Sequence, residues 1–167
     1  VYLNASGNRL AALPDTLGDL ANLVELRLYH NRLAALPDTL GELARLRELH
    51  AMNNALTALP PTIGGLRALC KLDLQDNRLA ALPDSLGELS KLAELNLRNN
   101  RLPTLPATLA NLHSLRTLDL RANPLRSLPT ALLDLPHLEK LDLRWTRFAP
   151  PPAALRKLEG RGCLVYT

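Results

Sequence analysis

The sequence has very few aromatic side chains. One tryptophan, one phenylalanine and three tyrosines make up 3% of 167 residues, although 47% of the chain is hydrophobic. This indicates an interior built from leucine and alanine rather than the aromatic-rich core of an ordinary globule. The sequence also lacks an apolar run approaching 18 residues and a signal peptide, so we expect no membrane partner.

Motifs for reaction chemistry are missing as well. There is no GxSxG, Walker or HExxH motif, so the sequence predicts no enzyme and no cofactor. His30 and His50 with Asp73 could be drawn as a metal site, but no third imidazole or thiol has matching spacing, so we expect no metal. Cys70 is expected to be a small core filler. Cys163 has no dependable base beside it, which argues against a catalytic thiol.

What the sequence does contain is a strict repeat. Alternating leucines such as Leu26 and Leu28 indicate short strands, and each is followed by an asparagine within the frame LxxLxLxxNxL. A fixed period of this kind is typical of a solenoid, in which each unit buries its apolar side on its neighbours. The asparagines, 23 residues apart, are Asn8, Asn31, Asn54, Asn77, Asn100 and Asn123. The predicted strands centre near Leu3, Leu26, Leu49, Leu72, Leu95, Leu118, Leu141 and Leu164.

The residues around each strand predict how the chain turns. An asparagine amide offers two donors and an acceptor, so the six asparagines are expected to form a structural ladder that satisfies turn backbone. Leucine–proline pairs such as Leu36–Pro37 follow, and proline suits the first position of a helical turn. We therefore predict an α/β solenoid, a right-handed superhelix with a parallel concave β-sheet and short helical or 3-10 turns on the convex side.

The two cysteines fall at the fourth and eighth predicted strands. At about 4.8 Å per strand they lie about 19 Å apart, whereas a disulfide needs Cα atoms within about 7 Å. Free thiols favour a reducing compartment, so we expect a cytoplasmic protein; a secreted effector that acts inside a host cell is an alternative.

The repeat changes at both ends. Residues 1–145 are predicted to form the repeats, the first truncated and without its capping segment, and residues 146–167 a C-terminal cap. In the cap, Thr146 replaces the asparagine, residues 153–158 favour a short helix, and Trp145 and Phe148 are expected to cover the end. Leu164 and Tyr166 are expected to return to the core columns.

The consensus LPxxLGxLxxLxxLxLxxNRLxxLP resembles the 23-residue leucine-rich repeats (LRRs) of the Ras-suppressor and plant Ras-group-related proteins, and those of bacterial LRR proteins. The resemblance covers almost the whole chain. It implies that a protein partner binds on the concave sheet. The alanine- and arginine-rich filler is similar to arrays from GC-rich bacteria, which serve as recognition domains of secreted effectors, including ubiquitin ligases, or are attached to kinases.

Strand residues that alternate with the core leucines supply the candidate partner-binding surface. Three arginines fall on adjacent strands, where like charges repel. Either neighbouring aspartates balance them, or they bind an acidic patch on the partner. A second group of large amphipathic side chains suits a binding hot spot. The candidates are Tyr29, His30, His50, Met52, Asp73, Gln75, Arg98, Asp119, Arg121, Asp142, Arg144 and Trp145.

Two functional hypotheses follow. The first is a non-catalytic interaction module in which Tyr29 and Met52 anchor the partner, and the predicted selector of Arg98, Arg121 and Arg144 recognises its charge. Charge reversal of Arg121 and Arg144 should then abolish binding but barely change thermal unfolding. The second is the recognition domain of a larger bacterial effector or signalling enzyme. The net charge of +4 permits an acidic partner. Interleaved aspartates and the scarcity of aromatic residues argue against nucleic acid.

Overall fold

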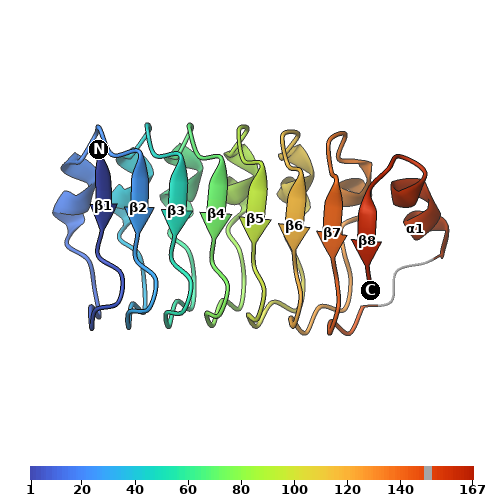
Figure 1. The fold of residues 1–167 in the computed structure, drawn as a ribbon, viewed down its shortest axis with the longest axis horizontal. Coiled ribbons are helices and arrows are strands. Elements are labelled where there is room, and N and C mark those ends of the chain that lie inside the picture. The colour runs from blue at the N-terminus through green and yellow to red at the C-terminus, as the bar shows by residue number, and fades with distance from the viewer. Residues whose placement is uncertain (149–151) are drawn as a thin grey trace.

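Eight short strands form one parallel sheet in chain order, as predicted (Figure 1). The computed structural model describes residues 1–148 and 152–167. Short turns connect the strands behind the sheet, and the one α-helix among the described residues, α1 (Pro152–Glu159), lies at the C-terminal end. The strands are β1 (Tyr2–Asn4), β2 (Glu25–Arg27), β3 (Glu48–His50), β4 (Lys71–Asp73), β5 (Glu94–Asn96), β6 (Thr117–Asp119), β7 (Lys140–Asp142) and β8 (Leu164–Tyr166).

The leucine at the centre of each repeat strand builds the core. Leu26 pairs with Leu49, and Leu49 pairs with Leu72, so identical side chains stack from strand to strand. All three are completely buried. Because side chains alternate between the two faces of a strand, the residues on either side of each leucine point away from the core.

Behind the sheet, each leucine–proline pair leads into a 3-10 helix, which confirms the predicted convex turns. Proline occupies the N-cap, as at Pro37, where its φ is −68°. A glycine in each of the first four helices allows close packing: a Cβ on Gly41 would lie 2.3 Å from the Thr62 carbonyl oxygen. The helices are η1 (Asp15–Asp19), η2 (Asp38–Glu42), η3 (Pro61–Gly65), η4 (Asp84–Glu88), η5 (Ala107–Asn111) and η6 (Thr130–Asp134).

The asparagines form the predicted ladder, and each links two repeats. The Asn77 amide donates to the carbonyl of Leu74 in its own repeat at 3.0 Å and to that of Ala51 in the preceding repeat at 2.9 Å. Its Oδ1 accepts the N–H of Leu56 at 3.0 Å. Asn31, Asn54, Asn100 and Asn123 make the equivalent bonds. Asn8, which is exposed, donates only within its own repeat, to Ala5 and Ser6.

The C-terminal end follows the prediction in its helix but differs in its last strand. The short helix is confirmed, and Phe148 packs against the core. In β8, however, Val165 pairs with Leu141 and contacts the core, whereas Leu164 and Tyr166 are 60% and 39% exposed. The assignment of these two residues to the core was therefore wrong, because β8 begins one residue out of step with the repeat. Along the described chain, no helix is both long and apolar enough to cross a membrane.

Candidate functional site

The side of the sheet that faces away from the core, which we call the open face, carries the candidate residues. Lateral neighbours follow the strand register, so that His50 pairs with Arg27 on one side and with Asp73 on the other. The alignment continues beyond the strands, where the Asn99 N–H donates to the Arg121 carbonyl at 2.8 Å. The predicted columns of neighbouring side chains are therefore confirmed.

At the N-terminal end of the open face, the predicted aromatic group is only partly brought together. The rings of Tyr29 and His30 meet edge to face, with centroids 5.5 Å apart. Tyr29 and Met52 are half-buried, and His30 is exposed. His50 instead turns toward Glu48, and its Nε2 lies 3.0 Å from a carboxylate oxygen. Tyr29, His30 and Met52 are thus available as contact residues, whereas His50 is already engaged.

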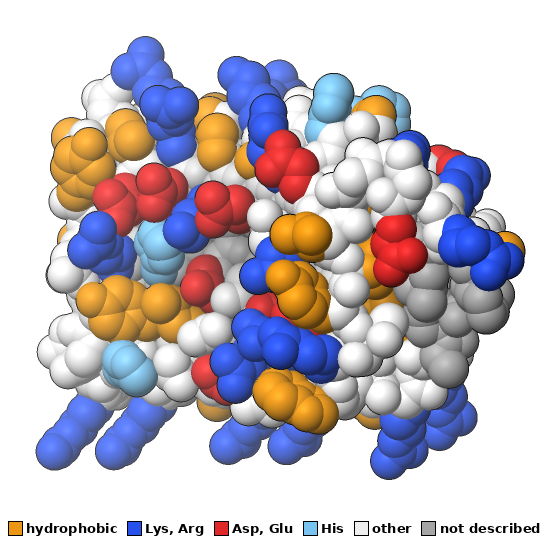
Figure 2. Space-filling view, turned by 45° about the vertical axis from the view of Figure 1, so that its right-hand side comes forward, with side chains coloured by type: hydrophobic (Ala, Val, Ile, Leu, Met, Phe, Trp, Pro, Cys, Tyr) orange, Lys and Arg blue, Asp and Glu red, His pale blue; other side chains and the backbone are white. Residues whose placement is uncertain are grey.

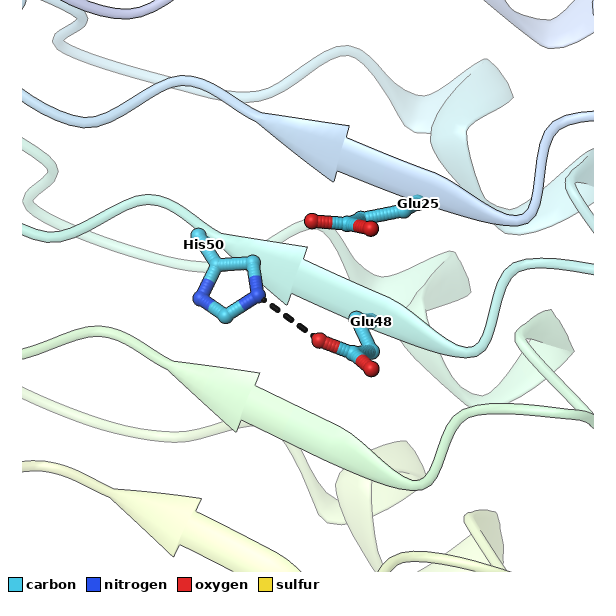
Figure 3. A group of neighbouring side chains, drawn as sticks. All are labelled: Glu25, Glu48 and His50. Carbon is cyan, nitrogen blue, oxygen red and sulfur yellow. Dashed lines mark hydrogen bonds and ion pairs between the residues drawn. The ribbon is translucent and has the colours of Figure 1, made fainter. Parts of the chain in front are cut away.

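Three side chains on β2 and β3 could hold a metal ion, but they are not the three considered from the sequence. Glu25, Glu48 and His50 converge on the open face, with ligand atoms within 4.8 Å of one another (Figure 3). Both carboxylates already have a partner, since Arg27 Nε donates to Glu25 and His50 faces Glu48. Like charges on neighbouring strands repel, and Arg27 offsets that repulsion at Glu25, whereas the contact between His50 and Glu48 is a hydrogen bond. We therefore interpret the group as a hydrogen-bonded polar cluster.

At the centre of the open face, Asp73 and Gln75 are held by neighbouring polar groups. The Gln75 N–H donates to Asp73 Oδ1 at 3.2 Å, and the Asn96 amide donates to Gln75 Oε1 at 3.0 Å. Burial raises the pKa of Asp73, although the Gln75 N–H and the charge on His50 act in the opposite direction. This carboxylate is therefore less favourable in its ionised form than an exposed aspartate.

The three arginines of the predicted selector do not share one environment. Arg121 Nε donates to both oxygens of Asp119, at 2.9 and 3.0 Å, and lies 3.5 Å from Asp142. Arg144 donates to Asp142 from Nε at 3.0 Å and from Nη2 at 2.7 Å. Within the described residues, Arg98 forms no ion pair. The balancing role of the aspartates therefore holds for two of the arginines, and Arg98 is the one left without a counter-charge.

Asp142 is the buried charge of this group, with a side chain only 1% exposed. Burial acts to raise its pKa, but the hydrogen bonds from Arg144 and the charges of Arg121 and Arg144 outweigh burial, so its pKa is lowered. Reversing both arginines would leave this carboxylate buried beside new negative charges. The double reversal would therefore destabilise the fold, contrary to the expectation from the sequence.

A cation–aromatic cluster, made of Lys140, Arg144, Trp145 and Tyr166, lies at the C-terminal end of the open face. The Arg144 guanidinium lies 5.2 Å from the Tyr166 ring centroid and 5.6 Å from that of Trp145. Lys140 Nζ lies 5.5 Å from the Tyr166 ring. Figure 2 shows hydrophobic and basic side chains gathered at this end of the face. Tyr166 was missed from the sequence because it was assigned to the core.

Trp145 also occupies an unfavourable backbone conformation. The residue before each ladder asparagine, and the one before Thr146, has positive φ. Gly7 and Asn99 suit this left-handed region, but Trp145, with φ 61°, does not. The conformation costs roughly 1–2 kcal/mol for a residue of this kind. Trp145 is 68% exposed, so burial does not offset this cost, and the expectation that it covers the cap was wrong.

Cys163 does not have the environment of a nucleophile. Both cysteines are free, and they lie beside β4 and β8, which are four strands apart in the sheet. Burial raises the pKa of Cys163, and the charge on Arg161 opposes this only in part. Because the reactive form of cysteine is the thiolate, the raised pKa keeps Cys163 in its unreactive form.

Known proteins share both the repeat and the fold. Residues 44–102 and 67–125 match the family described as leucine rich repeat. A Leptospira interrogans LRR protein superposes with a TM-score of 0.92 and 34% sequence identity, over 99% of this chain and 42% of that one. Comparison with curated proteins found no match. The chain is a leucine-rich repeat protein.

Two plant receptors of known structure are also similar. One is the LRR ectodomain of the Arabidopsis thaliana membrane receptor kinase GASSHO1/SCHENGEN3, in complex with CASPARIAN STRIP INTEGRITY FACTOR 2. It has a TM-score of 0.83 and 34% identity over 92% of this chain and 19% of that one. The other is the peptide hormone receptor RGFR1 in complex with RGF2, with a TM-score of 0.77 and 26% identity over 98% and 31%. The chain thus spans less than half the length of each of these proteins.

Proposed function

We propose that this chain is a non-catalytic module that binds a protein partner on the open face of its sheet. The observation that carries the proposal is the composition of this face, where large amphipathic side chains stand among ion-paired charges. Tyrosine, tryptophan and arginine are the residues that most often supply binding energy at interfaces. The plant receptors with the same fold were solved in complex with partners, one of them a peptide hormone receptor, which supports a protein or peptide ligand.

In this proposal the open face has two contact regions. The N-terminal region is centred on Tyr29 and Met52, which are half-buried and therefore partly pre-organised for a partner. The C-terminal region contains the arginine column, with Arg98 as the charge that is free to meet a carboxylate. Bidentate pairing of arginine with a carboxylate gives such a contact its geometry.

Binding assays with surface variants test the proposal. Affinity capture with the unaltered chain should recover a partner that Tyr29→Ala/Met52→Ala and Arg98→Glu each fail to retain. Asp84→Lys, on an exposed residue of η4 behind the sheet, is the matched control for a change of charge and should retain the partner. Thermal unfolding of every variant shows whether the fold is kept. Loss of the partner only in the Asp84 variant would place binding on the back of the solenoid and reject the proposal.

A second form of the proposal is that the chain is the recognition domain of a larger signalling protein or effector. The observation that favours it is coverage, since the chain matches 19% of a receptor kinase ectodomain and 42% of the Leptospira protein. Sequencing the complete reading frame tests this form. A catalytic domain in the same frame would support it, and a frame that encodes only repeats and caps would reject it.

A further inference from the structure

The cation–aromatic cluster is ordered before any partner arrives. Lys140, Tyr166, Arg144 and Trp145 alternate cation and ring, at the 5.2 to 5.6 Å separations typical of cation–π contacts. The buried Asp142 carboxylate holds Arg144 through Nε and Nη2. Within the described chain no group accepts a hydrogen bond from Arg144 Nη1, so this donor is free for a ligand.

Exposed apolar surface accompanies these charges. Trp145 is 68% exposed and Leu164 60%, and Tyr166 stands between the two cations. The left-handed backbone recurs at this position in every repeat, and Gly7, Asn53 and Asn99 adopt it with little strain, so folding does not require a tryptophan there. Strain that packing does not offset is typical of functional positions.

The charges around the cluster define the charge and length of a ligand that would bind there. From β5 to β8 on the open face, four cations (Arg98, Arg121, Lys140 and Arg144) face three carboxylates (Glu94, Asp119 and Asp142), so the region carries a small net positive charge. From β2 to β4 the sign changes, because Glu25, Glu48, Asp73 and Asp76 outnumber Arg27 and Lys71. A long polyanion would be repelled there, whereas a short acidic segment fits on the C-terminal half alone.

We infer that the cation–aromatic cluster binds a short linear segment of the partner in which an aspartate or glutamate lies beside an aromatic or aliphatic side chain. This inference rests on the proposed function. The carboxylate pairs with Arg144 Nη1, and Lys140, on the other side of Tyr166, adds positive charge nearby. The neighbouring apolar side chain packs on Trp145, Tyr166 and Leu164. A linear segment brings both groups to the same end of the face without contact elsewhere.

Selection of random twelve-residue peptides displayed on phage, with the immobilised chain as bait, tests this inference. The enriched peptides should carry Asp or Glu within about three positions of Trp, Phe, Tyr or Leu. Their binding should weaken as salt rises, because the charges are exposed. Trp145→Gly and Tyr166→Ala should each reduce affinity about tenfold or more, as expected for hot-spot residues. Trp145→Gly should fold normally, because glycine relieves the strain.

Two controls separate this inference from the proposed function. Tyr29→Ala should leave the affinity of the enriched peptides unchanged, since it lies at the opposite end of the open face. Three outcomes would each overturn the inference. They are enriched peptides that lack acidic residues, Trp145 and Tyr166 variants that bind the peptides as tightly as the unaltered chain does, and a twelve-nucleotide single-stranded DNA probe that binds more tightly than the peptides. If enriched peptides lose affinity only with Tyr29→Ala, the cluster is not the site but the proposed function stands.

Discussion

Replacing Asn77 and Asn8 with alanine compares the same ladder position in two surroundings. Asn77 is 8% exposed, and its side chain contacts Leu56, Ala51 and Leu74. Asn8 is exposed and donates only within its own repeat. Both substitutions remove the same atoms, so any difference in the free energy of unfolding reports the hydrogen bonds between repeats.

The expected loss at Asn77 can be worked out from the groups left behind. The Ala51 carbonyl keeps the Asn54 amide at 3.2 Å, and the Leu74 carbonyl keeps the Asn100 amide at 3.0 Å. Only the Leu56 N–H loses its sole partner. A buried unpaired group costs about 1–3 kcal/mol, and each lost bond to a carbonyl about 0.5–1.5 kcal/mol, so Asn77→Ala should lower the free energy of unfolding by about 2–6 kcal/mol.

Guanidinium denaturation followed by circular dichroism measures both variants. Asn8→Ala should cost less than about 1 kcal/mol, because its partners remain open to water. Equal losses in the two variants, or a loss below about 1 kcal/mol at Asn77, would refute the ladder as a source of cohesion between repeats.

Three further substitutions test other features of the fold. Thr146→Asn should raise the free energy of unfolding by about 1 kcal/mol. The Oδ1 of the new asparagine would accept the N–H of the buried Leu125, which has no acceptor among the described residues. An unchanged denaturation midpoint would count against this prediction. Ala122→Asn should stabilise by about 0.5–1 kcal/mol, since asparagine tolerates the φ of 53° at this position better than alanine; an equal or lower melting temperature would contradict it. Asp73→Asn should raise the melting temperature at pH 7. Because the pKa of Asp73 is raised in the folded state, the penalty is complete above that pKa and absent below the unfolded value of 3.8, so the gain should disappear near pH 3; a gain independent of pH would contradict it.

The repeats were predictable because one period satisfies several physical requirements at once. Leucines on one side of the strand, an amide at the turn and proline at the start of the 3-10 helix all recur with the same spacing. The strand centres at Leu26 and Leu49 and the bonds of Asn77 therefore followed from the sequence. Each requirement supported the same register, which left no alternative for the central strands.

The C-terminal strand was not predictable from the same period. Leu141 pairs with Val165, so the chain between β7 and β8 contains one residue more than the repeat. A shift of one residue exchanges the two faces of a strand, which brought Leu164 and Tyr166 out of the core. Past Thr146 the repeat has no asparagine or leucine–proline pair to reveal the shift.

The ion pairs on the open face had a signal in the sequence, and balance of the arginines by neighbouring aspartates was one of the two predicted alternatives. Asp119 and Arg121, like Asp142 and Arg144, are two residues apart, with the aspartate at the end of a strand, the arginine just past it and a core leucine between them. Residues at this spacing project from the same face, so opposite charges there meet within the strand before they meet a partner. The sequence left open whether the aspartates balance the arginines or the arginines bind an acidic partner, and the structure shows the balance for Arg121 and Arg144.

The two-way bonding of the asparagine amides has a consequence for how such a protein can change in length. Each amide N–H donates to a carbonyl of the preceding repeat, and each amide oxygen accepts an N–H from that same repeat. Every internal junction uses the same set of atoms. Duplication or deletion of one complete 23-residue segment therefore recreates an identical junction. Growth by whole modules leaves the remaining interior unchanged, whereas insertion of a fraction of a module breaks the junctions on both sides.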